Sequence, residues 1–137
     1  MKRRVSQKYP GIPCAKFLME YHFVIPGRPV PAPRMTNKSK FVRPEALRYL
    51  EYKEKIGWFA QKSGVTKIDT DIEVECRFFI NGGREPDIDK LVKAILDGLN
   101  GIAWSDDSKV RRIIAEKLGS KTEYAEVMIR EYQLQNR

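Results

Sequence analysis

Apolar and charged side chains alternate most strictly in the middle of the chain, from Asp71 to Phe79. Every second position there is apolar, and these positions are Ile72, Val74, Cys76 and Phe78. A period of two is typical of a strand with one face in a core and the other in solvent. Shorter segments of the same kind predict three further strands, over residues 21–25, 110–118 and 123–132.

Two segments show a helical period instead of the alternation. The first helix is expected from Pro44 to about Lys62, because proline suits the first turn of a helix and Ser63 and Gly64 interrupt the pattern. Its apolar stripe is imperfect and is expected to consist of Leu47, Leu50, Ile56 and Phe59.

The second helix is expected over residues 87–100. Asp87 is a suitable N-cap, and Gly101 is a suitable C-terminal stop. The apolar side of this helix, which should face the core, carries Leu91, Val92, Ile95 and Leu99. Trp104, shortly after the helix, is interpreted as a packing residue.

The order strand, helix, strand, helix, strand, strand predicts an α/β or α+β fold, with a short mixed sheet of about four strands packed against two main helices. A length of 137 residues fits one domain, expected over residues 19–137. Residues 1–18 are expected to form a basic, loosely ordered arm rather than a secretion signal, because polar residues and prolines interrupt them. No apolar run approaches the roughly 18 residues of a membrane span, so no membrane partner is expected.

The charge of the chain is strongly positive, with 26 Lys and Arg against 18 Asp and Glu. This excess favours a polyanionic partner such as nucleic acid, although solubility alone would also explain it. Basic residues gather in the first half, whereas acids lie mainly beyond residue 68. The candidate DNA-contact residues are Arg28, Arg34, Lys38, Lys40, Arg43, Arg77 and Arg84.

Cysteine and histidine are scarce, with two cysteines far apart and one histidine. A zinc site and a disulfide framework are therefore not expected, which suits a reducing cytoplasm.

Four carboxylates are the candidate chemistry: Asp87 and Asp89 at the start of the second helix, and Asp106 and Asp107 beyond its end. Carboxylates can hold magnesium for phosphodiester hydrolysis while leaving positions open for water and substrate. The helix rises about 16 Å, and residues 101–107 can span up to about 23 Å. The chain is therefore expected to be able to fold back and to bring the second acid pair beside the first.

Structural explanations for the same residues remain open. Asp87 could simply cap the helix, Asp89 could interact with the helix dipole, and Asp106 and Asp107 could lie in a solvated turn. Lys93 lies four residues after Asp89, so it could form a surface ion pair rather than act on a phosphate. Asp97, one turn after Lys93, has the same simple interpretation.

The run from Asp87 to Leu99, followed by Trp104-Ser105-Asp106-Asp107, resembles the signature of RusA-type Holliday-junction resolvases. The resemblance covers roughly residues 19–132 and depends on the order and spacing of the acids, the lysine and the apolar residues between them. It departs from the family at Lys90, where an asparagine is common, and in the basic loop.

The resemblance implies a RusA-like, homodimeric fold that cuts two opposed strands of a four-way DNA junction with Mg²⁺, for which Mn²⁺ can substitute. By position, Asp87, Asp89 and Asp107 correspond to the metal-binding aspartates and Lys93 to the catalytic lysine. Asp106 would be an adjacent acid that assists at the metal. The family occurs in bacteria and commonly in prophages.

Two other functions are compatible with the same sequence. A non-catalytic module could bind branched DNA with the acids serving as caps, and its binding would weaken with salt without any cleavage. A related metal nuclease could prefer flaps or forks to four-way junctions.

Overall fold

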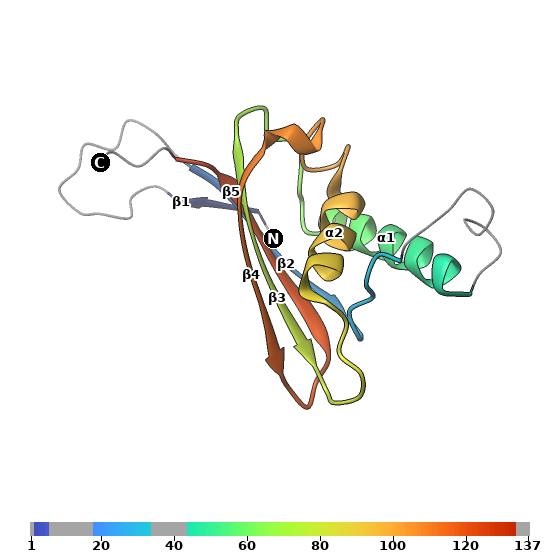
Figure 1. Cartoon of the computed structure of the whole chain (residues 1–137). Helices are drawn as coiled ribbons and strands as arrows, with labels where there is room; N and C mark the ends of the chain where they lie inside the picture. The colour runs from blue at the N-terminus through green and yellow to red at the C-terminus, as the bar shows by residue number, and fades with distance from the viewer. Residues whose placement is uncertain (1, 6–17, 34–43, 134–137) are drawn as a thin grey trace.

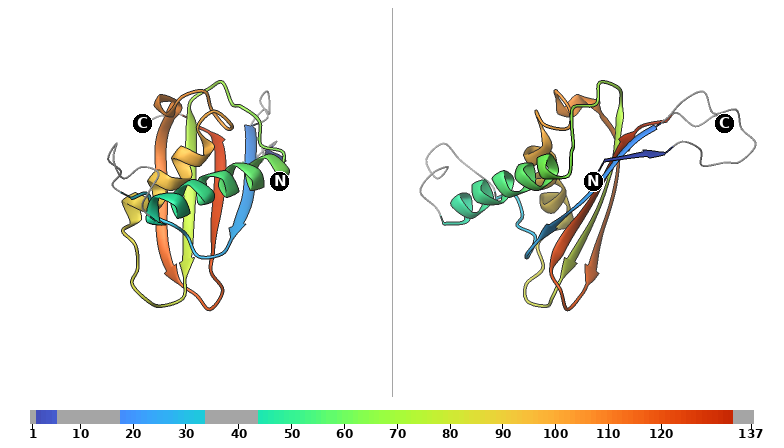
Figure 2. Two further views of the ribbon diagram at one scale, coloured as in Figure 1. Left: turned by 90° about the vertical axis from the view of Figure 1, so that its right-hand side faces the viewer. Right: turned by 180° about the vertical axis from the view of Figure 1, so that it is seen from behind.

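The computed structural model describes residues 2–5, 18–33 and 44–133 (Figure 1). Two helices lie on one side of a single sheet, as the views of Figure 2 show. The helices are α1 (Pro44–Lys62) and α2 (Ile88–Leu99), with a short 3-10 helix, η1 (Asp107–Lys109), after α2. The strands are β1 (Lys2–Val5), β2 (Leu18–Pro26), β3 (Ile72–Ile80), β4 (Val110–Gly119) and β5 (Tyr124–Glu131).

The sheet is mixed, as predicted, and its strand order is β1-β2-β5-β3-β4. Neighbouring strands are antiparallel except for β3 and β4, which are parallel, with Ile72 beside Val110 and Ile80 beside Gly119. Parallel neighbours require a crossover connection, and α2 supplies it. Consequently α2 begins at the end of the sheet where β3 finishes, and the chain returns to the opposite end before β4 starts.

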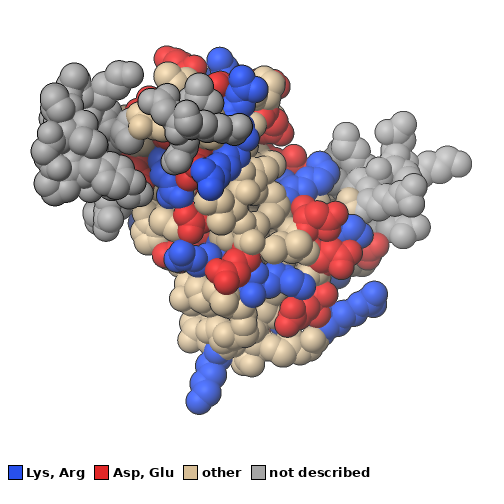
Figure 3. Space-filling model, turned by 60° about the vertical axis from the view of Figure 1, so that its left-hand side comes forward, with Lys and Arg blue, Asp and Glu red and all other residues tan. Residues whose placement is uncertain are grey.

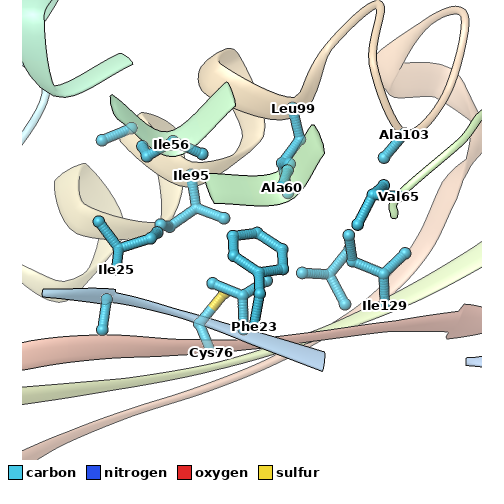
Figure 4. Packing of buried hydrophobic residues seen from close by; sticks show 14 of the residues in the cluster. Phe23, Ile25, Ile56, Ala60, Val65, Cys76, Ile95, Leu99, Ala103 and Ile129 are labelled. Atoms are coloured by element: carbon cyan, nitrogen blue, oxygen red, sulfur yellow. The ribbon is translucent and has the colours of Figure 1, made fainter. Parts of the chain in front are cut away.

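The core lies between the helices and one face of the sheet (Figure 4). The predicted alternation in β3 is confirmed, because Ile72, Val74, Cys76, Phe78 and Ile80 are buried and the residues between them are only partly so. Burial raises the pKa of the Cys76 thiol to about 12, so this cysteine is a packing residue.

The two helices approach each other closely where Gly98 of α2 lies against Ile56 of α1. The predicted bounds of both helices are confirmed to within one or two residues, and Leu91, Ile95 and Leu99 are buried as expected. The predicted stripe of α1 is partly wrong, because Leu47 is 46% exposed. The buried side of α1 instead carries Ala46, Tyr49, Tyr52, Ile56, Gly57 and Ala60.

Residues 2–5 belong to the sheet, although the sequence suggested a loosely ordered arm. They form β1, which pairs with Leu18–Tyr21 of β2. The sheet therefore has five strands, the four expected ones and β1. Within the described residues, no helix is long and apolar enough to cross a membrane.

Candidate metal centre

The first acid pair lies at the start of α2. Asp87 occupies the N-cap position with extended backbone angles, and its carbonyl oxygen accepts a hydrogen bond from the Leu91 backbone N–H. Its side chain makes no capping hydrogen bond. Asp89 follows in the first turn, where the helix dipole favours a negative charge. Both residues are exposed, and neither carboxylate has a hydrogen bond or ion pair with any residue that the structure describes. Both are therefore available to a cation.

The loop that leads into α2 is held by contacts from the neighbouring strands. Arg28 donates to the carbonyl oxygens of Gly82 and Arg84, each at 3.0 Å, and to the Glu123 carboxylate at 2.7 Å. Lys117 donates to the Pro86 carbonyl oxygen at 3.1 Å. These contacts fix Asp87 near the C-terminal ends of β3 and β4.

Glu123 is the acceptor at the centre of this anchor. Its carboxylate also accepts a hydrogen bond from the Asn81 backbone N–H at 3.0 Å. The hydrogen bond from Asn81, followed by that from Arg28, lowers the pKa of Glu123 below its ordinary value. Glu123 and Arg28 were not predicted in this role, because 95 residues separate them in the chain and no local pattern connects them.

The second acid pair precedes β4. Asp106 caps η1, because its side chain accepts a hydrogen bond from the Ser108 backbone N–H at 3.1 Å. A hydrogen bond from the Ser108 hydroxyl, followed by this backbone hydrogen bond, lowers the pKa of Asp106. Asp107 Oδ1 accepts a hydrogen bond at 2.8 Å from Nε1 of Trp104, which is completely buried, so its predicted packing role is confirmed. The core thus orients the Asp107 carboxylate.

The two acid pairs lie at opposite ends of the β3–α2–β4 unit. Asp87 lies near Lys117, whereas Asp107 begins η1, which leads directly into Val110. The twelve residues of α2 span about 18 Å, and the seven steps from Val110 to Lys117 span about 23 Å, so roughly 20 Å separates the pairs. Among the described residues, no three His, Cys, Asp or Glu side chains are grouped as metal ligands. The expectation that one chain folds back to unite these acids is therefore wrong, because the return segment ends at the start of a strand parallel to β3.

Lys93 lies on α2 between the two ends and is paired with Asp97. Its Nζ donates to Asp97 Oδ2 at 3.1 Å, while its side chain is 63% exposed. The hydroxyl of Tyr49, a buried residue of α1, donates to the same oxygen. Burial, with the neighbouring Asp97 carboxylate, raises the pKa of the Tyr49 hydroxyl, which therefore stays protonated as a donor. The i,i+4 contact that forms is between Lys93 and Asp97, and Tyr49 is a partner that the helical pattern did not indicate.

The predicted DNA-contact residues have different surroundings. Arg34, Lys38, Lys40 and Arg43 lie outside the described residues. Arg28 already forms the hydrogen bonds, described above, that hold the loop before α2. Arg77 lies on the face of the sheet away from the helices, among the carboxylates of Glu75 at 3.0 Å, Glu126 at 3.4 Å and Glu116 at 3.9 Å. Arg84 is exposed, and its guanidinium has no partner within the part of the chain that the structure describes.

The side of the sheet away from the helices is not a uniformly basic surface. Figure 3, which brings this side forward, shows basic and acidic side chains interspersed around uncharged ones. Arg130 donates to Glu73 and Glu75, each at 2.6 Å. Although burial alone would lower the pKa of Arg130, these hydrogen bonds raise it. A polyanion would meet nearly balanced charge on this face. Phosphate contacts from the described residues are therefore expected elsewhere on the protein.

Comparison with known proteins now defines the class. The chain matches the family of the endodeoxyribonuclease RusA over residues 26–130, which includes both acid pairs, Lys93, β3, β4 and β5 up to its last residue. The chain therefore belongs to the RusA endodeoxyribonuclease family. Membership implies an endonuclease that acts on DNA, with Holliday-junction resolution as its activity. No curated protein matches the chain in sequence.

Proposed function

We propose that this protein is a magnesium-dependent, homodimeric Holliday-junction resolvase whose metal site is completed by a second copy of the chain. Asp87 and Asp89 of one subunit would hold the cation together with the partner's Asp107, and the partner's Asp106 would assist. The observation that carries the proposal is the position of the acid pairs at opposite ends of α2 in a member of an endodeoxyribonuclease family. In a two-fold dimer with α2 antiparallel to its counterpart, the two kinds of end meet twice.

The donor set suits a hard divalent cation. All four candidate ligands are exposed aspartates, and carboxylate oxygens are the ligands that Mg²⁺ and Mn²⁺ prefer. One subunit alone offers only two of them at each end, so the residues fit a metal only in the dimer. When bound, the cation would supply charge stabilisation and an activated water for phosphodiester hydrolysis.

The protein's own residues would orient and neutralise the substrate. Trp104 fixes the rotamer of Asp107, and the N-terminal position of Asp89 leaves its carboxylate facing solvent. Asp97 holds the amine of Lys93 at the surface of α2, where it would stabilise negative charge on the phosphate being cut. Two sites related by a two-fold axis suit a four-way junction, which has the same symmetry.

Cleavage of a synthetic four-way junction tests the activity. With Mg²⁺, we expect paired symmetric nicks in opposed strands, and Asp89→Asn should abolish cleavage while junction binding persists. Binding without cleavage under any divalent cation would indicate a non-catalytic DNA-binding module. Faster cleavage of flaps or forks than of four-way junctions would indicate the related nuclease.

Mixing two inactive variants tests whether the site is shared. In a heterodimer of Asp89→Asn and Asp107→Asn subunits, one shared site has both substitutions and the other has none. Cleavage should therefore return on mixing, as single nicks at about a quarter of the wild-type number of sites, because about half of the dimers in an equimolar mixture are heterodimers and each has one intact site. If each site belonged to one chain, both sites of the heterodimer would be damaged and the mixture would stay inactive. Mixing Asp87→Asn with Asp89→Asn is the matched control, because both substitutions then affect the same end and activity should not return.

A further inference from the structure

Strand β4 forms a free edge of the sheet. It is the last strand in the order and is paired with β3 alone among the described strands. It is also ten residues long, so it offers a long row of backbone N–H and C=O groups. Exposed edges of this length invite pairing with another chain.

The side chains of β4 are unusually apolar for an exposed edge. Ile113 is 43% exposed and Ile114 is 37% exposed. Adjacent residues of a strand point to opposite faces, so each face of the edge carries one exposed isoleucine. Charged residues flank them on both sides, at Arg112 and Glu116. An added strand would cover both isoleucines at once.

We propose that a second copy of this chain binds along this edge, with the two β4 strands antiparallel and the two-fold axis at Ile114. The inference rests on the proposed function, for which it identifies the dimer interface. In this register each Arg112 lies directly opposite the partner's Glu116, which gives two cross-strand ion pairs on the face away from the helices. Both residues have only long ion pairs within their own chain, Arg112 with Glu73 at 3.6 Å and Glu116 with Arg77 at 3.9 Å. Each can therefore accept a closer partner.

The opposite face tolerates the same register. There Arg111 would lie opposite the partner's Lys117, which is a like-charge pair. Each of these residues already has an acid close by, Asp71 at 3.0 Å from Arg111 and Glu85 at 3.2 Å from Lys117. These contacts reduce the repulsion between the two cations.

This arrangement also brings together the ends that the metal site requires. Antiparallel pairing places the Val110 end of one β4 beside the Gly119 end of the partner's β4. The loop that leads to Asp87 lies next to that Gly119 end. Because the axis is perpendicular to the sheet, the helices of both copies lie on the same face. The alternative is a dimer in which the two sheets stack through their open faces, that is, the faces away from the helices. The helices of the two copies would then lie on the outer sides, separated by more than the roughly 10 Å between stacked sheets.

A cross-link at the axis tests the proposal. Paired residues of antiparallel strands have Cα atoms about 4.5–5.5 Å apart, which suits a disulfide. In a Cys14→Ser background, Ile114→Cys should form a covalent dimer on mild oxidation, and the buried Cys76 should not react. Val24→Cys, 39% exposed on the open face, and Trp58→Cys, 56% exposed on α1, are the controls. A dimer linked through position 24 or 58 and not 114 would overturn the proposal.

Charge reversal provides a second test that needs no cysteine. By sedimentation, Arg112→Glu and Glu116→Arg should each weaken the dimer about 100-fold or more, because each creates two like-charge pairs. The double variant should regain an affinity within a few-fold of wild type. A monomeric wild type, or single variants that remain dimeric, would overturn the proposal. Failure of the proposed function can be distinguished from failure of the proposed interface. A dimer linked through β4 that cuts no four-way junction would refute the function. An active enzyme whose Arg112→Glu variant dimerises as tightly as wild type would refute the interface.

Discussion

The close contact between α1 and α2 at Gly98 allows a quantitative prediction about the free energy of unfolding. The contact also matters for the site, because α2 carries Asp89 and Lys93. A Cβ added at Gly98 would lie 2.8 Å from both Cβ and Cγ2 of Ile56, and 3.0 Å from its Cδ1. Ile56 is fully buried, and its β-branched side chain has little rotamer freedom in a helix. Gly98→Ala therefore requires the two helices to move apart.

Two opposing terms set the size of the effect. Alanine is favoured over glycine in a helix by about 1 kcal/mol, whereas overpacking a core costs about 1–3 kcal/mol or more. We expect Gly98→Ala to lower the free energy of unfolding by about 1–2 kcal/mol, or the melting temperature by about 3–8 °C. Urea and thermal unfolding measure both quantities.

Gly57 on α1 is the matched control. A Cβ there would meet Cδ1 of Ile102 at 2.9 Å, and this atom is the far end of a partly buried side chain that can rotate. Gly57→Ala should therefore be neutral or stabilise by up to about 1 kcal/mol. If Gly98→Ala were as stable as wild type while Gly57→Ala lost stability, the reasoning from contact geometry would be refuted.

Three further predictions concern the site and its support. Trp104→Phe removes the hydrogen-bond donor to Asp107 and should lower the free energy of unfolding by about 1–3 kcal/mol. The same substitution should raise the Mg²⁺ concentration needed for cleavage. An unchanged Mg²⁺ titration would contradict the proposal that Trp104 orients Asp107. Because the folded-state pKa of Glu123 is lowered, its stabilisation is complete at neutral pH and disappears as the pH falls through that pKa. Glu123→Gln should therefore differ from wild type in urea unfolding at pH 7 and converge with it in acid, whereas a pH-independent difference would exclude the ionic cause. Tyr49→Phe should cost about 1–2 kcal/mol by losing its hydrogen bond to Asp97, and an unchanged unfolding midpoint would show that this contact stabilises nothing.

Most elements could be predicted because local signals define them. Pro44 and the Ser63-Gly64 pair set the bounds of α1, and a period of two identified β3. The buried side of α1 was harder to predict because tyrosine is compatible with either a core or a surface. Tyr49 is buried where it meets α2, while Leu47, about 200° away around the axis of α1, lies on the other side of the helix and stays exposed.

The candidate residues of the site were predicted, but their arrangement was not. Spacing along the chain sets only an upper limit on distance, and it allowed residues 101–107 to fold back toward Asp89. The direction of β4 decides the outcome. Because β4 is parallel to β3, the chain must pass along the whole length of the sheet before β4 begins, and no local pattern specifies that pairing.

The separation of the acids by the length of α2 has a consequence for regulation. On the proposed function, an isolated subunit holds two incomplete half-sites, so a newly made chain would be harmless to DNA until it meets another. The cleavage rate of a dilute sample would then rise with the square of protein concentration and become linear once dimers saturate. Synthesis level alone would thus act as a threshold between a silent and an active nuclease.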